Sequence, residues 1–303
     1  MKAILFVGHG SRDHEGNDQV REFINNLRAY IDASILVETC FLEFERPTVG
    51  QGIDLCVEKD AIEIAVIPIM LLQAGHSKIH IPGAIDEAKA KYPHISFTYG
   101  RPIGIHEEAL EILQTRLIEA GEDLDSPGED TSILLLGRGG SDPDANSDLY
   151  KIGRLLWEKT KYTIVEPAFM GVTDPLVQAG IERCIKLGAK KVIILPYFLF
   201  TGILIKRLEE LVLEFQKSFP GIEFQLANYF GFHPKLQTIL LNRAEEALQG
   251  EVKMNCDTCQ YRVNAMEFIG HHHHHDHDHD HHHDHHHEHH HHTHHDEKAG
   301  SAK

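Results

Sequence analysis

The chain repeats itself, and this repeat constrains the fold more than any other feature of the sequence. Four segments recur in the same order in the second half of the 303 residues. An internal period of roughly 128 residues indicates gene duplication and two related domains. The matched segments are AILFVGHGSRD (3–13) with SILLLGRGGSD (132–142), VETCFLEFERPTVGQGI (37–53) with VEPAFMGVTDPLVQAGI (165–181), IAVIPIMLLQAGHSK (64–78) with VIILPYFLFTGILIK (192–206), and KYPHISFTYGRPIGIH (91–106) with SFPGIEFQLANYFGFH (218–233).

Within each repeat, short apolar runs such as KAILFVG and IEIAVIPIML alternate with amphipathic stretches of helical period. Runs rich in β-branched residues, separated by helices, predict βαβ units and a parallel sheet. We therefore expect an α/β fold of two duplicated, doubly wound parallel-sheet domains, at residues 1–120 and 131–250. The acidic segment AGEDLDSPGEDTS (120–132) is typical of a linker. A CxxC segment (251–270) and a His/Asp-rich tail (271–303) follow.

The helices of the first repeat are expected at about 18–30, from Thr48, at about 77–91 and from His106. His106 recurs as His233 in the second repeat, which predicts a structural role near a helix start rather than a catalytic one.

Charge and hydropathy exclude two classes of partner. The formal net charge is −17, of which the tail contributes −5 and the body −12. An acidic body argues against binding to nucleic acid or to anionic membrane surfaces. No apolar run approaches the ~18 residues that a membrane span needs. The N-terminal run is too short for a signal peptide and reads as a first strand, so a cytoplasmic protein is expected.

The duplication provides an internal control, because groups present in only one repeat are candidates for chemistry. His9 corresponds to Arg138, Glu43 to Gly171, and His76 to Leu204. The glycines that flank His9 are kept in the second repeat, which indicates a structural turn. All three lost groups follow predicted parallel strands, at the edge where open α/β sheets bind their ligands.

Two imidazoles and one carboxylate suit a divalent first-row metal such as cobalt, iron or nickel. A neutral imidazole also accepts a proton near physiological pH. The Gly-His-Gly turn could instead bind phosphate, but a dinucleotide fingerprint requires a third glycine where Asp13 stands. The three groups together therefore predict a metal site with open positions, formed by the first repeat.

The five cysteines are odd in number, which argues against a disulfide framework. Cys40, Cys56 and Cys184 fall in predicted core elements and are expected to be small buried side chains. Cys256 and Cys259 form a CxxC pair after the last predicted helix, where a thioredoxin-like role is disfavoured. Zinc and iron–sulfur centres both require about four ligands, so spacing alone does not choose between them.

Residues 271–303 hold 19 histidines and seven acidic residues, with almost no apolar side chains. Such a tract cannot form a core and is expected to lack fixed structure. Imidazole and carboxylate groups bind cobalt, nickel, copper and zinc without strict geometry. A purification tag is the alternative, but its histidines would not be interrupted by Asp and Glu. We interpret the tract as a metal reservoir or delivery arm.

The motifs FVGHGSRD, FLEFERPTV and MLLQAGHSKIHIP resemble those of class II chelatases, in particular the long, two-domain sirohydrochlorin cobaltochelatases of the CbiX type. The resemblance covers residues 1 to about 265. It implies insertion of Co²⁺ into sirohydrochlorin in anaerobic cobalamin biosynthesis, without ATP. It also implies that His9 and His76 are active-site histidines and that Glu43 completes the metal site.

The resemblance extends to the C-terminal segments, because some members carry an M-x-C-x-x-C motif and a histidine-rich tail. Met254, Cys256 and Cys259 fit that motif, which implies an iron–sulfur cluster. A cluster shared across a homodimer, or completed by ligands other than cysteine, would supply the missing ligands.

Two alternatives remain open. Two histidines and a glutamate do not distinguish Co²⁺ from Fe²⁺ or Ni²⁺, so a sirohydrochlorin ferrochelatase or a nickel chelatase fits the same residues. A non-catalytic metal store or chaperone would bind many divalent ions through the tail and would not act on a tetrapyrrole.

Overall fold

The computed structural model describes residues 1–250. The CxxC segment and the histidine-rich tail, and with them Cys256 and Cys259, lie outside the described residues. The first repeat contains β1 (Lys2–Gly8), α1 (His14–Leu27), β2 (Leu36–Phe41), α2 (Val49–Glu58), β3 (Glu63–Ile69), the π-helix η2 (His76–His80), α3 (Ile81–Lys91), β4 (Ser96–Tyr99) and α4 (Glu107–Glu119). The second contains β5 (Thr131–Gly137), α5 (Pro143–Glu158), β6 (Ile164–Phe169), α6 (Val177–Lys186), β7 (Lys191–Pro196), α7 (Ile203–Ser218), β8 (Glu223–Leu226) and α8 (Pro234–Leu248).

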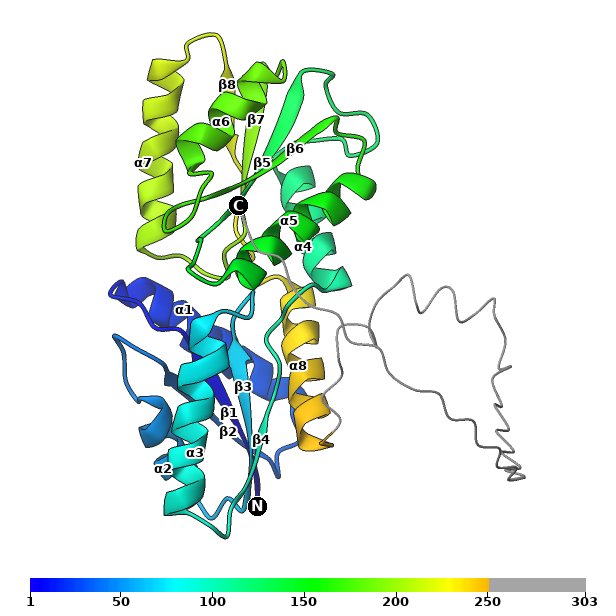
Figure 1. Ribbon diagram of the computed structural model, residues 1–303. Helices are drawn as coiled ribbons and strands as arrows, with labels where there is room; N and C mark the ends of the chain where they lie inside the picture. The colour runs from blue at the N-terminus through cyan, green and yellow to red at the C-terminus, as the bar shows by residue number, and fades with distance from the viewer. Residues whose placement is uncertain (251–303) are drawn as a thin grey trace, which may run out of the picture. The chain divides into compact units, whose positions relative to one another are not determined.

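The expected fold class is confirmed. Each repeat builds a four-stranded sheet, in the orders β2-β1-β3-β4 and β6-β5-β7-β8. Every strand pair in these sheets is parallel, as Figure 1 shows. Since β1 lies between β2 and β3, the chain reverses its direction of travel across the sheet there. The carboxyl end of β1 is therefore at a topological switch point.

The strands alternate their side chains between two apolar layers. In β1, Leu5 and Val7 contribute to a core under α2 and α3 that belongs to the first repeat alone. Ile4 and Phe6 point to the opposite face. There they join a core that both sheets share, which includes Leu135 of β5. The two repeats are thus held together by a common apolar layer rather than by a flexible hinge.

The last helix of each repeat packs on the other repeat. Helix α4 contacts α5 and β7, whereas α8 contacts β3 and β4 (Figure 1). The repeats in sequence, 1–120 and 131–250, are therefore not the units of packing. The sequence did not reveal this exchange, because an amphipathic helix fits the apolar face of either sheet equally well.

Two buried arginines fix the exchanged helices by the same geometry. Arg243 of α8 is 2% exposed and donates to Pro102 O (3.1 Å) and Ile103 O (2.9 Å) of the first repeat. Burial lowers the pKa of Arg243 to about 10, which leaves it protonated at neutral pH. Its equivalent Arg116 in α4 donates to the carbonyl oxygens of the second repeat, at Tyr229 (2.7 Å) and Phe230 (2.6 Å).

Helix starts follow the sequence signals. Asp13 and Asp142 cap α1 and α5 through their side chains. His106 and His233 cap α4 and α8, each accepting a backbone N–H through Nδ1, so their predicted structural role is confirmed. Burial is the main cause that lowers the pKa of both imidazoles.

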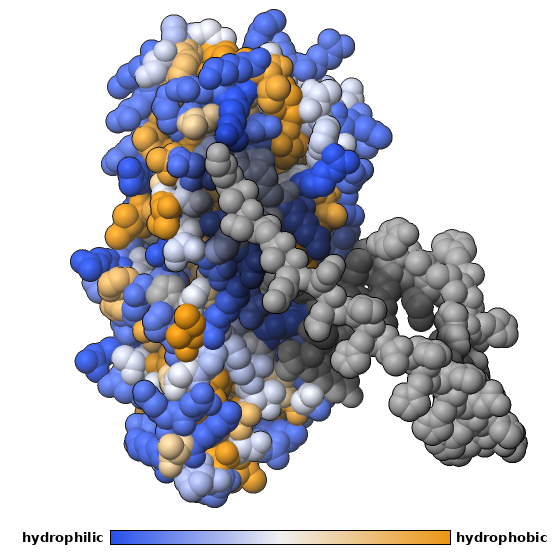
Figure 2. Space-filling model, in the orientation of Figure 1, coloured by the Kyte–Doolittle hydropathy of each residue, from blue (hydrophilic) through white to orange (hydrophobic). Residues whose placement is uncertain are grey.

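The three described cysteines are free and buried, as predicted. Burial raises the pKa of the Cys56 thiol to about 12 and that of Cys184 to about 11. Within residues 1–250, no helix is long and apolar enough to cross a membrane. On the face drawn in Figure 2, apolar residues are scattered through a mainly hydrophilic surface.

Candidate active site

The loop after β1 is shaped by a close backbone approach. Gly10 has φ +87°, and a Cβ there would lie only 1.7 Å from the carbonyl oxygen of Glu43. Asn17 in α1 holds the same loop from the other side, since its amide accepts from Ser11 N (2.8 Å) and donates to Ser11 O (2.8 Å). Glycine is therefore required at Gly10, and this turn sets the position of the preceding His9.

The structure brings His9 and Glu43 together. Beyond the end of the sheet, Leu42 N donates to Gly8 O (2.9 Å) and Glu43 N donates to His9 O (3.1 Å). These bonds continue the β1–β2 pairing by two residues and place both side chains at one edge. His9 Nδ1 lies 3.4 Å from Glu43 Oε1 and 3.1 Å from Gly10 O. Both side chains are about one third exposed, at 29% and 32%.

His9 also contacts the second repeat. Arg138 Nη1 lies 2.8 Å from His9 Nε2. A guanidinium is only a donor, so Nε2 must be the acceptor in this contact. The proton of the neutral imidazole is then on Nδ1, which faces the carbonyl of Gly10 and the carboxylate of Glu43.

His76 is the first residue of the π-helix η2, which follows β3. Its backbone therefore lies beyond the strand next to β1, in the expected segment. The side chain of His76 is outside the described part of the structure, so its distance to His9 is left as a prediction. The expected single helix from about residue 77 is replaced by η2 followed by α3, and such π-turns are frequent at functional sites.

In the second repeat the same backbone carries different groups. Met170 N donates to Gly137 O (2.9 Å) and Gly171 N donates to Arg138 O (3.2 Å), as in the first repeat. However, Gly171 offers no carboxylate. The segment after β7 forms the regular helix α7, which contains Leu204 where the first repeat has His76. The second repeat therefore lacks the carboxylate and the histidines, although the backbone bonds that join its first two strand-end loops are preserved.

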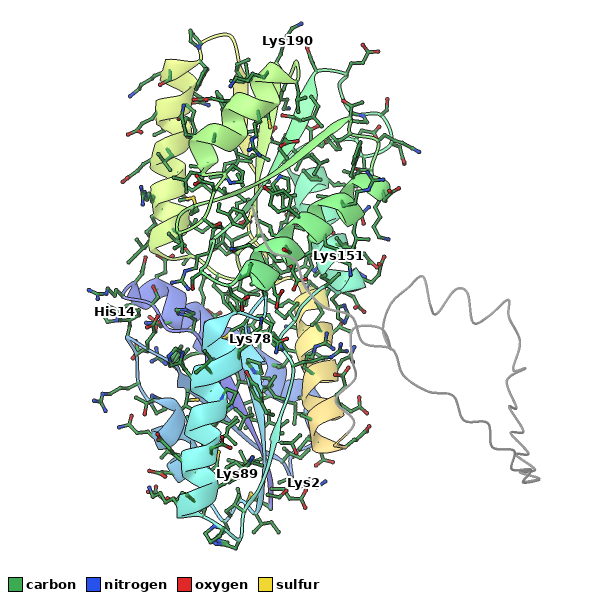
Figure 3. The ribbon with its side chains drawn as sticks, viewed as in Figure 1. Lys2, His14, Lys78, Lys89, Lys151 and Lys190 are labelled. Atoms are coloured by element: carbon green, nitrogen blue, oxygen red, sulfur yellow. The ribbon has the colours of Figure 1, made fainter. Side chains whose placement is uncertain are left out.

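Two reciprocal ion pairs join the strand-end loops of the repeats. Lys78 in η2 lies 2.7 Å from Asp142, the N-cap of α5, and Figure 3 shows it where the repeats meet. Its equivalent Lys206 lies 2.7 Å from Asp13, the N-cap of α1. The bond from Lys78 lowers the pKa of Asp142, and the bond from Lys206 lowers that of Asp13.

Comparison with known proteins identifies the family of the chain and confirms its fold. The family model CbiX matches residues 3–120 and 132–247, which are the two repeats. The chain belongs to the CbiX family. The chain is 73% identical over 272 residues to the sirohydrochlorin cobaltochelatase of Priestia megaterium, covering 90% of this chain and 88% of that protein. It is also 39% identical over 251 residues to the sirohydrochlorin ferrochelatase of the same organism, covering 83% and 92%.

A solved chelatase structure shows the same architecture. The sirohydrochlorin chelatase SirB from Bacillus subtilis subspecies spizizenii, solved in complex with cobalt, superposes with a TM-score of 0.70 at 33% identity. The match covers 83% of this chain and 99% of that chain. The resemblance found in the sequence motifs is thereby confirmed.

Other residues of the CbiX motifs have structural partners. Glu45 accepts from Asn17 (2.9 Å) and pairs with Arg21 (3.0 Å). The backbone N–H of Arg46 holds the pKa of the Glu45 carboxyl below its usual range, helped by Arg21. Phe44 is 55% exposed with φ +61°, a backbone conformation that is uncommon outside glycine. Glu45 therefore anchors the loop that carries Glu43.

The basic residues Arg12, Arg46, Lys78 and Arg101 are candidates to meet the carboxylates of a tetrapyrrole, and some of them are engaged elsewhere. Lys78 is paired with Asp142, and Arg101 forms two bonds of 3.0 Å to Glu246 of the exchanged helix α8. Arg12 is the more available cation, with its guanidinium 4.8 Å from the ring centre of Phe44.

The described side chains contain no group of three His, Cys, Asp or Glu residues placed to hold a metal ion. The described part of the candidate site is the His9–Glu43 pair with Arg138. A surface hollow of about 460 Å³ lies at the opposite, amino end of β6 and is lined by none of these residues. Sequence comparison of the repeats recorded Arg138 only as the loss of a histidine. Arg138 nevertheless lies at the same site, because it contacts His9, the residue at the equivalent position of the first repeat.

Proposed function

We propose that this protein is a sirohydrochlorin cobaltochelatase, which inserts Co²⁺ into sirohydrochlorin in anaerobic cobalamin biosynthesis. The observation that carries the proposal is the 73% identity, across nine tenths of the chain, to a sirohydrochlorin cobaltochelatase. The polar pair at the switch point of the first sheet fits that activity. A ligand there has access from solvent, and both side chains are partly exposed.

The chemistry requires little covalent machinery. Two pyrrole N–H protons must leave the macrocycle while four ring nitrogens replace water or protein ligands on the metal. His9 has a basic nitrogen for a proton or a metal, and its Nδ1 proton is held by Gly10 O and Glu43. In this proposal His9 and His76 hold Co²⁺, and as the metal passes to the ring nitrogens their freed lone pairs accept the leaving pyrrole protons. Glu43 balances the charge of the imidazolium and passes protons outward.

Different divalent metals can be inserted by the same chemistry. The 39% identical relative is named a ferrochelatase, so closely related chains serve iron as well as cobalt. Imidazole and carboxylate ligands do not prefer cobalt to nickel, and supply in the cell contributes to the choice. Iron insertion for sirohaem is the second candidate.

The C-terminal segments extend the proposal. We place an iron–sulfur cluster at Cys256 and Cys259, completed by ligands from a second copy of the chain in a homodimer or by groups other than cysteine. The tract at 271–303, with its 19 histidines, is a metal reservoir for the active site. Free thiols at the three described cysteines fit a reducing compartment such as the cytoplasm.

The deciding experiment is anaerobic absorbance spectroscopy of the full-length protein with sirohydrochlorin and excess Co²⁺. Parallel reactions contain Fe²⁺ or Ni²⁺, and reactions without enzyme give the spontaneous rate. Faster appearance of the cobalt product than in these controls is expected, and the order of rates gives the preferred metal. No acceleration with any ion, while the protein binds many metal equivalents, would instead support a metal store or chaperone.

The tail is tested by deleting residues 271–295. Turnover at saturating Co²⁺ should stay within about two-fold of the full chain, because the tail supplies metal and no catalytic group. At limiting Co²⁺ the truncated protein should be slower. Loss of turnover at saturating metal would contradict the reservoir role.

A further inference from the structure

The contact between His9 and Arg138 joins equivalent positions of the two repeats. His9 follows β1 as Arg138 follows β5, and His9 Nε2 lies 2.8 Å from Arg138 Nη1. Equivalent positions related by a two-fold axis touch only where they lie close to that axis. The reciprocal pairs Lys78–Asp142 and Lys206–Asp13 obey the same symmetry. The second repeat, which lacks the candidate catalytic groups, therefore contributes one side chain to the site of the first.

That side chain occupies the nitrogen which a metal would need. The Nδ1 side of His9 faces two acceptors, Gly10 O at 3.1 Å and Glu43 at 3.4 Å, so it carries the proton. Only Nε2 has a lone pair in the ring plane, and Arg138 donates to it. One lone pair cannot bind both a guanidinium proton and a metal ion. Metal binding at His9 therefore requires Arg138 to move away.

Arg138 is suited to such a movement. Arg138 is exposed to solvent. Among residues 1–250 its guanidinium forms no ion pair with a carboxylate. Its positive charge is therefore available to an anion, and its planar fork matches a carboxylate better than it matches an imidazole. Sirohydrochlorin, the substrate under the proposed function, is rich in carboxylates.

We propose that Arg138 is a substrate-operated gate on His9. In the resting protein its guanidinium blocks Nε2. When the tetrapyrrole binds, the N–H of Arg138 transfers its hydrogen bond from Nε2 to a substrate carboxylate, and the freed lone pair becomes available to Co²⁺ or to a pyrrole proton. The proposal rests on the proposed function and predicts that the tetrapyrrole binds before the metal.

The gate makes the two substrates thermodynamically coupled. If the tetrapyrrole draws Arg138 away from His9, it raises the affinity of the site for metal, and by reciprocity the metal raises the affinity for the tetrapyrrole. The apparent KM for Co²⁺ should then fall as sirohydrochlorin increases. A residue with a purely structural role would not produce this dependence.

The test compares three full-length variants, Arg138→Gln, Arg138→Lys and the control Arg154→Gln, with wild type. Arg154 is in the same repeat, on α5, where it stacks over Trp157. KM values are measured by absorbance at buffered free Co²⁺, so the unchanged tail affects all variants equally. In Arg138→Gln, KM for sirohydrochlorin should rise roughly ten-fold, as for one lost charge-assisted bond. KM for Co²⁺ should fall several-fold and lose its dependence on sirohydrochlorin.

Arg138→Lys should restore most of the affinity for sirohydrochlorin, and Arg154→Gln should match wild type. The gate is overturned if Arg138→Gln leaves both KM values unchanged or shifts both upward. If that variant unfolds, wild type alone still decides: a KM for Co²⁺ that does not depend on sirohydrochlorin also overturns the gate. Absence of turnover in wild type would instead refute the proposed function.

Discussion

The two repeats share a scaffold and differ in chemistry at one edge of their sheets. Both use the same strand order, and an arginine of each last helix, Arg116 or Arg243, holds two carbonyls of the other repeat. At the carboxyl edge the first repeat presents His9 and Glu43, whereas the second presents Arg138 and a glycine. The features that hold the fold together are therefore symmetric, and the groups that differ between the repeats are the candidates for function.

The largest effect is expected where the repeats differ most. His9→Ala should lower kcat/KM for cobalt insertion by at least roughly 100-fold, because it removes a metal ligand and proton acceptor. Glu43→Gln keeps the shape of the side chain but not its charge, and should cost roughly ten- to 100-fold. Both are measured by anaerobic absorbance with sirohydrochlorin and Co²⁺.

His14→Ala is the matched control for His9. His14 is in the same repeat, its side chain is 91% exposed, and its distance to Glu45 is 3.9 Å. Turnover close to wild type is expected. An active His9→Ala protein beside an impaired His14→Ala protein would show that the site has been placed wrongly.

Where the repeats agree, matched substitutions should have equal effects on stability. Arg243→Met and Arg116→Met each leave two carbonyl oxygens of the other repeat without their donor. A buried acceptor without its donor costs about 1–3 kcal/mol, so each variant should lose about 2–5 kcal/mol in the free energy of unfolding. Denaturant unfolding followed by circular dichroism measures it.

The exposed Arg154→Met is the control for these two variants, with an expected change within about 0.5 kcal/mol. A large cost for only one of the two buried arginines would contradict the symmetric role of the exchanged helices.

Comparing the repeats in sequence predicted the fold class, the alternation of strands with helices, and the place of His106 at a helix start, because these follow from local signals. His106 and His233 illustrate this, because a shared histidine proved to be a shared helix cap. The exchange of α4 and α8 depends on which sheet a helix reaches through its loop, and no local signal encodes that. Arg138 was missed for a related reason: its role depends on a contact with His9 across the symmetry axis.

A smaller and more selective effect is expected at the turns. Gly10 (φ +87°) and Gly139 (φ +83°) both lie against a carbonyl oxygen, so Gly10→Ala and Gly139→Ala should each lower stability, by about 1–3 kcal/mol. Only Gly10→Ala moves Glu43 relative to His9, and it should also lower kcat roughly ten-fold. Parallel thermal unfolding and turnover assays separate the effects. Equal losses of kcat in both variants would indicate that the second turn also acts on the site.

The smallest effect is expected from the reciprocal ion pairs. Lys78→Met and Lys206→Met each disconnect a strand-end loop from the other repeat. Each should lower kcat/KM roughly two- to five-fold, which is the range expected for loss of an ion pair near the surface.

The pKa of Asp142 is lowered and that of Lys78 is raised, chiefly by their mutual bond. The pair is therefore lost only when pH falls through the lowered pKa of the acid or rises through the raised pKa of the lysine. Between about pH 6 and 9 the effect of Lys78→Met should be constant. Lys91→Met, whose partner Asp54 is in the same repeat, should leave kcat/KM unchanged. A Lys78→Met defect that varied across this pH range would mean that the lysine acts through a titrating group of the active site instead of through its contact with Asp142.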